Sequence, residues 1–440
     1  MRARAAARRQ AKEYLRKHQL MPGRIRRAPA RGLGLVVVIP CHDEPEVLAT
    51  LEDLHRCADS GRVVEVIVVI NASEAGNEGT RARNADSLRA IESRAAEFEA
   101  DGRFRVHAVN YPRLPARHAG VGLARKLGMD EALARIIDAG GEDGIIVSLD
   151  ADCRVEENYL CAMADHFARH AASPACSVYF EHPLAGPLSD AHYRAVTDYE
   201  LYLRYYRHGL LLAGHPCAHY TVGSCMAVRA SAYARQGGMN RRKGAEDFHF
   251  LNKLMLLGGF SELRGTTVRP SPRLSGRVPF GTGRALREAL AKPPQSLRVW
   301  APEAFDDLAA LFARIDRLRD DPASVFPALS GVMNDYLAAS GIHHKLAEIA
   351  RHTATAASFR SRFFRWFDGL CALKFVRYAS AHGYGQQPVA QAALALLQRR
   401  RLAKGTEGAR ARELLRRYRR LDRDGETGAS SPALTKAQRA

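Results

Sequence analysis

The sequence of 440 residues lacks several features that mark common protein classes. It has no run of roughly 20 apolar residues, the length that a helix needs to cross a membrane. The basic N-terminus has no apolar stretch of the kind that a secretory signal carries. No Gly-x-Gly-x-x-Gly follows the first predicted strand, and no Gly-x-x-x-x-Gly-Lys-Ser/Thr occurs. These absences disfavour a membrane-spanning protein, a dinucleotide dehydrogenase and a P-loop nucleotidase.

The eight cysteines form no Cys-x-x-Cys pair. Spread over a long chain with no export signal, they favour reduced thiols and a cytoplasmic location. His215, Cys217 and His219 alternate, so they share a face if they lie on a strand, and a zinc site is geometrically possible. They supply only three ligands with a proline among them, so ordinary loop residues are the favoured interpretation.

Acidic residues are scarce at both ends of a chain whose net charge is +19. Residues 1–31 carry a net charge of +10 and residues 396–420 one of +8, whereas the body between them is close to neutral. Basic ends of this kind indicate an anionic partner and say little about the chemistry of the core. We expect peripheral contact with the anionic inner face of a membrane, because neither end contains a nucleic-acid recognition module.

Buried strands alternate with helices in the first part of the sequence. This alternation predicts an α/β domain that is Rossmann-like, with a mainly parallel sheet flanked by helices. Beyond about residue 286 helical patterns dominate, which predicts a mainly α-helical C-terminal region. The first four strands are expected at 33–39, 63–70, 104–109 and 144–149, and two more at 177–181 and 221–229. The expected parts are a basic helix and linker over 1–31, the α/β domain over 32–285, the helical region over 286–420 and a disordered tail over 421–440.

Two aspartates stand at the end of the fourth predicted strand. In an open parallel sheet, ligands bind at the carboxyl ends of the strands. Asp150 and Asp152 are two residues apart and therefore project in the same direction. Such a pair suits Mg²⁺ or Mn²⁺, which complete their shell with water and diphosphate oxygens. The strand-end position favours a metal site over the alternative, a structural role such as helix capping.

Five segments, in their order along the chain, resemble glycosyltransferase family 2, the inverting nucleotide-sugar transferases with the GT-A fold. The resemblance covers about residues 33–270 and is specific as an ordered set. The segments are Val36–Ile39 with Pro40, Asp43 and Glu44; Glu65–Ser73; Gly122–Gly128 with Arg125; Asp150-Ala151-Asp152; and Gly223-Ser224 followed by Arg229, Gly237-Gly238 and Glu246-Asp247.

The resemblance implies a metal-dependent inverting transferase that moves a sugar from a nucleotide-diphosphate sugar to a hydroxyl acceptor, such as a lipid-linked or envelope glycan. The acceptor must lose its proton as it attacks, so a carboxylate base is needed opposite the leaving group. The resemblance implies a base at Asp247 beside Glu246, and a Mn²⁺ or Mg²⁺ ion on Asp152 and Asp150. It implies donor contacts from Pro40, Cys41, Glu44, Asn71, Arg125 and Asp150. Arg277, in the glycine-rich segment 275–284, is a further candidate for contact with the donor diphosphate.

Each of these roles has a plainer alternative. Glu246 and Asp247 stand where acids commonly cap a helix. Arg125 is expected to meet the donor phosphates, to pair with a carboxylate of the Asp-x-Asp motif, or to form a solvated salt bridge. The glycine-rich segment 275–284 is either a lid over the donor diphosphate or a linker.

Two positions depart from the family pattern. Ile70-Asn71 replaces an Asp-Asp pair, so the carboxylate that reads the nucleobase is missing, although the Asn71 amide can still pair with a base edge. The histidine that often completes the metal site has no clear match, and Arg273, Arg277 and His249 are the candidates to replace it. These departures keep a second function open, a catalytically silent GT-A-like module that binds a nucleotide sugar or a surface.

Overall fold

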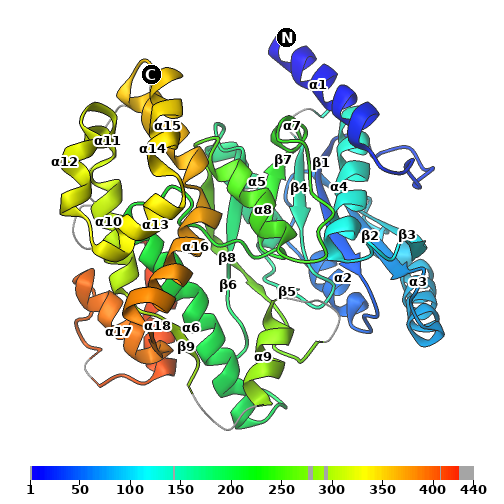
Figure 1. Ribbon diagram of the computed structural model, residues 1–440. Coiled ribbons are helices and arrows are strands. Elements are labelled where there is room, and N and C mark those ends of the chain that lie inside the picture. The colour runs from blue at the N-terminus through cyan, green and yellow to red at the C-terminus, as the bar shows by residue number, and fades with distance from the viewer. Residues whose placement is uncertain (1, 142–143, 276–280, 292–295, 407, 426–440) are drawn as a thin grey trace.

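The protein is described by a computed structural model that covers residues 2–141, 144–275, 281–291, 296–406 and 408–425 (Figure 1). An eight-stranded sheet forms the centre of the α/β domain, with the strand order β3-β2-β1-β4-β7-β6-β8-β5. The strands are β1 Leu33–Cys41, β2 Val63–Ser73, β3 Phe104–Leu114, β4 Ile145–Ser148, β5 Arg154–Val155, β6 Ala175–Phe180, β7 Met226–Arg229 and β8 Ser261–Arg269.

Strand β1 is the centre of the parallel half of the sheet. Val37 is in register with Val66 of β2 on one side and Val147 of β4 on the other, and both pairings are parallel. A strand with neighbours on both sides and helices over both faces has no exposed edge or face, which is why β1 is a continuous apolar run. Strand β7 is antiparallel to both β4 and β6, and β8 is parallel to β6. The expected α/β domain with a mainly parallel sheet is confirmed.

Alternate residues of β1 point into two different cores. Leu35, Val37 and Ile39 pack with α2, α3 and α5, whereas Val36 and Val38 pack with α4, α7 and α8. This follows from the period of two along a strand. The helices around the sheet are α2 Val47–His55, α3 Glu78–Phe98, α4 Val121–Asp138, α5 Tyr159–Arg169, α6 Asp190–Ala213, α7 Ala230–Arg235 and α8 Glu246–Met255.

The C-terminal region is mainly helical, as expected, and α6 joins it to the α/β domain (Figure 1). Leu201, Tyr205 and Leu210 of α6 share one apolar core with Phe305 and Phe363 of that region. Its elements are α9 Thr282–Leu290, β9 Arg298–Trp300, α10 Glu303–Phe312, α11 Ile315–Asp320, α12 Pro322–Val325, a 3₁₀ turn at Phe326–Ala328, α13 Gly331–Ala339, α14 Ile342–Arg351, α15 Ala356–Trp366, α16 Gly369–Ala379, a π-helical turn at Ser380–Tyr384, β10 Gln386–Pro388, α17 Val389–Arg399 and α18 Ala411–Asp424.

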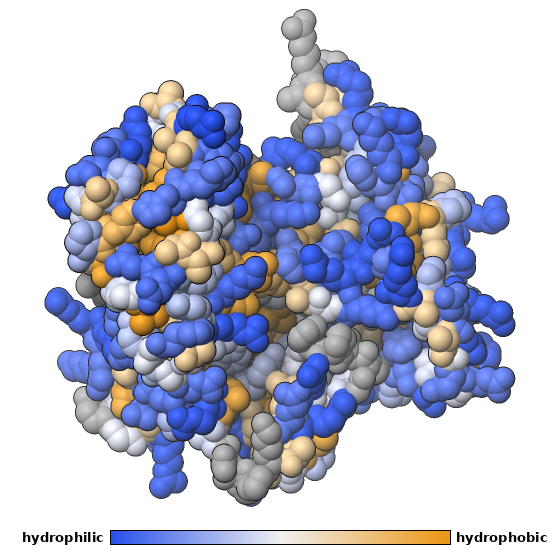
Figure 2. Space-filling model, viewed as in Figure 1, coloured by the Kyte–Doolittle hydropathy of each residue, from blue (hydrophilic) through white to orange (hydrophobic). Residues whose placement is uncertain are grey.

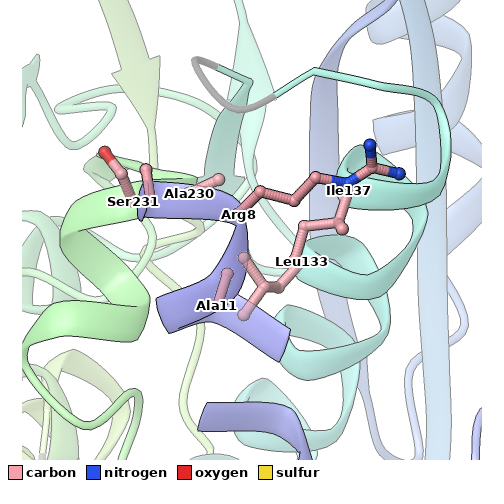
Figure 3. Close-up of a pocket in the computed structure, with 7 residues that line it drawn as sticks. Arg8, Ala11, Leu133, Ile137, Ala230 and Ser231 are labelled. Atoms are coloured by element: carbon pink, nitrogen blue, oxygen red, sulfur yellow. The ribbon is translucent and has the colours of Figure 1, made fainter. Parts of the chain in front are cut away.

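The basic N-terminal segment forms helix α1, Arg2–His18, and docks on the α/β domain. Figure 3 shows the seam, where Arg8 and Ala11 meet Leu133 and Ile137 of α4 and Ala230 of α7.

A buried polar cluster extends this contact between α1 and the domain. The Tyr14 hydroxyl donates to Asp130 at 2.8 Å and accepts from Lys126 at 2.9 Å. Helix α1 is therefore part of the folded body and presents only its other face to solvent.

The last turn of α18 packs against the protein through Asp422, so residues 421–424 belong to this helix and not to the tail that was expected from residue 421. Asp422 is 3% exposed and accepts hydrogen bonds from Arg204, Arg207, His208 and Tyr220. Burial favours the neutral carboxyl, but His208, Arg207 and Arg204 outweigh it and hold the pKa of Asp422 far below its ordinary value. This cluster fastens the end of the chain to α6. The rest of the expected tail, 426–440, lies outside the described residues.

We expect Asp422→Asn to lower the free energy of unfolding by about 3 kcal/mol, because it removes the carboxylate that the buried Arg204 and Arg207 share and leaves each with one remaining acidic partner. Urea unfolding followed by circular dichroism measures this loss. Asp424→Asn is the matched control, since Asp424 is exposed in the same turn, and we expect it to change stability by less than about 0.5 kcal/mol. Equal stability of the two variants would contradict the anchoring role of Asp422.

Candidate functional site

The candidate site lies at the carboxyl ends of β1 and β4. Glu44 follows β1, Asp150 and Asp152 follow β4, and Glu246 and Asp247 open helix α8. Arg273 follows β8 and contacts both strand ends. Segments far apart in the sequence therefore meet where open parallel sheets bind ligands.

A buried arginine joins the two halves of this site. Arg125 is 3% exposed, and its two terminal nitrogens donate to Asp150 on one side and to Glu246 on the other. Its Nε donates to the Ser148 hydroxyl at 3.1 Å. Burial opposes the charge, but the neighbouring carboxylates of Asp150, Glu246 and Asp247 outweigh it and raise the pKa of Arg125. Of the roles expected for Arg125, the structure places it in an ion pair with the Asp-x-Asp motif.

Two glycines make room for this contact. A Cβ atom at Gly223 would lie 2.6 Å from the Arg125 guanidinium carbon. A Cβ at Gly122 would lie 2.2 Å from the Arg242 carbonyl oxygen and 2.9 Å from Cβ of Glu246. Since such approaches are closer than packed atoms allow, any larger residue would push Arg125 or α8 out of place. The glycines thus set the distance between α4 and the start of α8.

Asp247 is a half-buried carboxyl in the first turn of α8. Burial and the adjacent Glu246 carboxylate raise its pKa, and Arg125 opposes them. Its Oδ1 accepts a hydrogen bond from the Phe248 amide at 2.7 Å. The preceding residue, Ala245, has a φ of 57°, a strained left-handed conformation that non-glycine residues rarely adopt. An acid with a raised pKa beside strained backbone is typical of functional sites.

Arg273 lies among three carboxylates on the other side of the site. It pairs with the buried Glu44, lies 3.4 Å from Glu46, and approaches Asp152 at 3.5 Å. Its guanidinium pKa is raised because Glu44, Asp152 and Glu46 outweigh the effect of burial. Arg273 was one of the candidates to replace the histidine that often completes the metal site in the family. The structure places it beside Asp152 of the Asp-x-Asp motif.

The expected donor-binding residues at β1 and β2 are close together, but their side chains are partly engaged in the fold. Asn71 is buried, and its amide donates to the carbonyls of Cys41 at 3.0 Å and Val69 at 3.2 Å. Cys41 is fully buried, while Pro40 is half-buried at the end of β1. The Asn71 amide therefore ties β2 to β1, a role that its sequence position did not indicate.

Other predicted residues have partners away from the site or lie outside the described residues. Arg277, with 276–280 of the glycine-rich segment, lies outside the described residues. His249 is on α8, where its nearest charged neighbours are Arg242, Asp368 and Lys253. His215 bonds with the Phe367 carbonyl at 3.0 Å, and His219 with Glu262 at 2.9 Å. These separate partners agree with the loop interpretation of the His215–His219 segment.

The side chains that could ligate a metal ion at this site suit only one kind of metal binding. Within the part of the chain that the structure describes, no three His, Cys, Asp or Glu residues form a group that could hold a metal ion. Asp150 and Asp152 are two hard oxygen donors after one strand, which fits a cation that takes most of its ligands from a diphosphate and water. The residues present therefore fit Mg²⁺ or Mn²⁺ bound together with substrate.

The family comparison agrees with this site. The model of glycosyl transferase family group 2 matches residues 145–289, a span from β4 to α9 that contains both acidic motifs and Arg273. The match covers about one third of the chain. Over this span the chain is similar to glycosyl transferase family group 2, and the α/β sheet with these motifs at its strand ends agrees with that similarity. The comparison with curated proteins gave no match.

Solved structures that resemble this chain are distant from it. TarS from S. aureus, residues 1–349 with UDP-GlcNAc, is 11% identical over 76% of this chain and 91% of its own, with a TM-score of 0.40. The mannosyltransferase PcManGT from Pyrobaculum calidifontis, with GDP-Man and Mn²⁺, is 18% identical over 96% of this chain and 98% of its own, with a TM-score of 0.36.

Sequence reasoning missed Ser148, the pairing of Arg125 with Glu246 and the partners of Arg273. Ser148 is a polar residue at the end of an otherwise apolar strand, and that break in the pattern was an available signal. Tyr199 of α6 is close enough to Asp247 for the carboxylate to raise the pKa of its phenol, after the larger effect of burial.

Proposed function

We propose that the protein is an inverting transferase that moves a sugar from a nucleotide-diphosphate sugar to an acceptor hydroxyl in one displacement. The observation that carries the proposal is the buried Arg125 guanidinium, which holds Asp150 on one side and Glu246 on the other. The Asp150-Asp152 pair, assigned to the donor, and the Glu246-Asp247 pair, assigned to the acceptor, then lie on two sides of the Arg125 guanidinium. That is the arrangement a single displacement needs, since base and leaving group act from opposite faces.

On the donor side, Asp150 and Asp152 would hold the divalent cation, Mn²⁺ or Mg²⁺. When bound, such an ion supplies Lewis-acid stabilisation of the departing nucleoside diphosphate. Glu44, Pro40 and Cys41 would border the donor at the end of β1. Arg125 acts on the donor through Asp150, because its guanidinium is buried and engaged with protein groups.

On the acceptor side, Asp247 would take the proton of the attacking hydroxyl. Its raised pKa makes it a stronger base than an ordinary aspartate, and Glu246 keeps it raised while pairing with Arg125. Figure 2 shows that the surface is hollowed between the helical region and the α/β domain, in the part of the view where Figure 1 places α8. An acceptor glycan would approach Asp247 from this side.

We expect Asp247→Asn to reduce kcat by about 1,000-fold, the order that a general base contributes, and to leave the affinity for nucleoside diphosphate unchanged. Asp152→Asn should reduce kcat and, unlike Asp247→Asn, should also weaken the binding of nucleoside diphosphate. The measurement is release of nucleotide from a panel of UDP-, GDP- and dTDP-sugars with Mn²⁺. Asp165→Asn, at an exposed position on α5, is the control. A wild-type protein that binds these donors but releases no nucleotide would favour the silent binding module.

The pH profile tests the coupling of Glu246 to Asp247. The base works when deprotonated, so activity should rise with pH up to the raised pKa of Asp247. Glu246→Gln removes the adjacent negative charge and lowers that pKa, so the acid limb of kcat should move to lower pH by about one pH unit. Glu78→Gln, an exposed charge change on α3, should leave the profile in place. An acid limb that stays fixed in Glu246→Gln would argue against Asp247 as the base.

We also propose that α1 brings the enzyme to an anionic membrane, where a lipid-linked acceptor would be found. Its docked face contains Ala11 and Tyr14, so the basic residues of its other face point outward. Helix α18 lies far from α1 (Figure 1), so the two basic ends do not form one continuous face. In the described ranges, no helix is long and apolar enough to span a bilayer. The exposed basic residues of this other face of α1 include Arg9, Lys12, Arg16 and Lys17.

Charge reversal of Arg9, Lys12 and Arg16 to Glu should weaken sedimentation with phosphatidylserine vesicles by about 100-fold, since each basic residue near the surface contributes about 1 kcal/mol. The measurement is made at a salt concentration of about 0.1 M, because screening weakens such contacts. Reversal of Arg412, Arg416 and Arg420 on α18 is the control and should change little. Equal loss in both variants, or tighter binding of the wild type to duplex DNA than to vesicles, would refute the role of α1.

A further inference from the structure

Arg273 occupies an unusual place for a side chain next to an Asp-x-Asp motif. It is three-quarters buried, its side chain being 24% exposed, and it reaches Glu44 after β1 and Asp152 after β4. Glu44 is 2% exposed, so this carboxylate has lost nearly all contact with water. A buried carboxylate needs a cation beside it, and Arg273 supplies that charge in the protein without substrate.

One hydrogen-bond donor of Arg273 is unused. Its Nε is buried and has no acceptor among the described residues. A buried donor without a partner costs free energy that a ligand oxygen could recover. Guanidinium groups bind the oxygens of phosphates with paired hydrogen bonds, so a diphosphate is the chemical class that suits Arg273.

The same guanidinium opposes a metal ion at Asp152. A divalent cation bound to that carboxylate would lie within a few ångströms of Arg273, and two like charges at that distance repel unless an anion separates them. A nucleoside diphosphate provides such an anion. Its negative charge can accept the hydrogen bonds of Arg273 and at the same time supply oxygen ligands to the cation.

We propose that Arg273 is a resident counter-cation of Glu44 and Asp152, and that a divalent cation binds tightly at Asp152 only together with a nucleoside diphosphate that takes over the guanidinium. The inference rests on the proposed function, since it uses the same donor site. Arg273 then couples the two ligands: each binds weakly alone, and each raises the affinity for the other by the same factor. Free metal in the cell would not occupy the site without donor.

The test measures Mn²⁺ binding to the full chain by electron paramagnetic resonance, with Mn²⁺ alone and with Mn²⁺ plus UDP, GDP or dTDP. Arg273→Gln should bind Mn²⁺ alone about tenfold more tightly than the wild type, within the range of ordinary coupling between two sites. It should also lose most of the increase that a nucleotide gives. Arg273→Lys keeps the charge and should behave like the wild type with Mn²⁺ alone.

The control for net charge is Arg269→Gln. Arg269 ends β8 and pairs with Glu156, so its loss should not change Mn²⁺ affinity. If Arg273→Gln binds Mn²⁺ alone no more tightly than Arg269→Gln, the inference is overturned. Asp152→Asn separates the two proposals: loss of Mn²⁺ binding with nucleotide in this variant supports the metal site itself, whatever Arg273 does. Thermal melting of Arg273→Gln shows whether the variant is folded when the affinity is measured.

Discussion

The site depends on one buried guanidinium. Arg125 leaves water almost completely, and the free-energy cost of burying its charge is offset by the carboxylates of Asp150 and Glu246 on two sides. Because both carboxylates are fixed to one planar group, the end of β4 and the start of α8 cannot move independently. The geometry between the Asp-x-Asp motif and the Glu246-Asp247 pair is thus set by ion pairs inside the protein.

Buried carboxylates also hold the two terminal helices, α1 and α18, on the body of the protein. Asp130 binds the Tyr14 hydroxyl of α1, and Asp422 of α18 collects two arginines and a histidine from α6. A chain with a large excess of basic residues can thus bury several of them, provided that each meets a carboxylate. The terminal segments that composition alone marks as basic ends are helices docked on the body, and only their outer faces remain available to an anionic partner.

Much of the fold was predictable because its causes are local. The first four strands are apolar runs between helical patterns, and the structure has them within a few residues of the expected bounds, with β2 and β3 extending further. Strand β8 was missed, since only Leu263 and the segment from Thr266 to Val268 are buried in it, and its place depends on pairing with β6 and β5. The sequence predicted that the helical region ends at residue 420, whereas α18 extends to Asp424. From the sequence Asp422 has the character of an exposed acid, because Arg204 and Arg207 come close to it only in the folded protein.

For the site, the sequence by itself determined the positions of the acids: Asp150 and Asp152 after an apolar strand, Glu246 and Asp247 at the start of a helix. Those positions follow from the short-range rules of strands and helices, which a single chain segment contains. Only the tertiary structure decided which cation meets which acid. Arg125 and Glu246 are 121 residues apart, and Arg273 and Glu44 are 229 apart. Contacts over such separations arise from the packing of whole elements, and no local pattern specifies them.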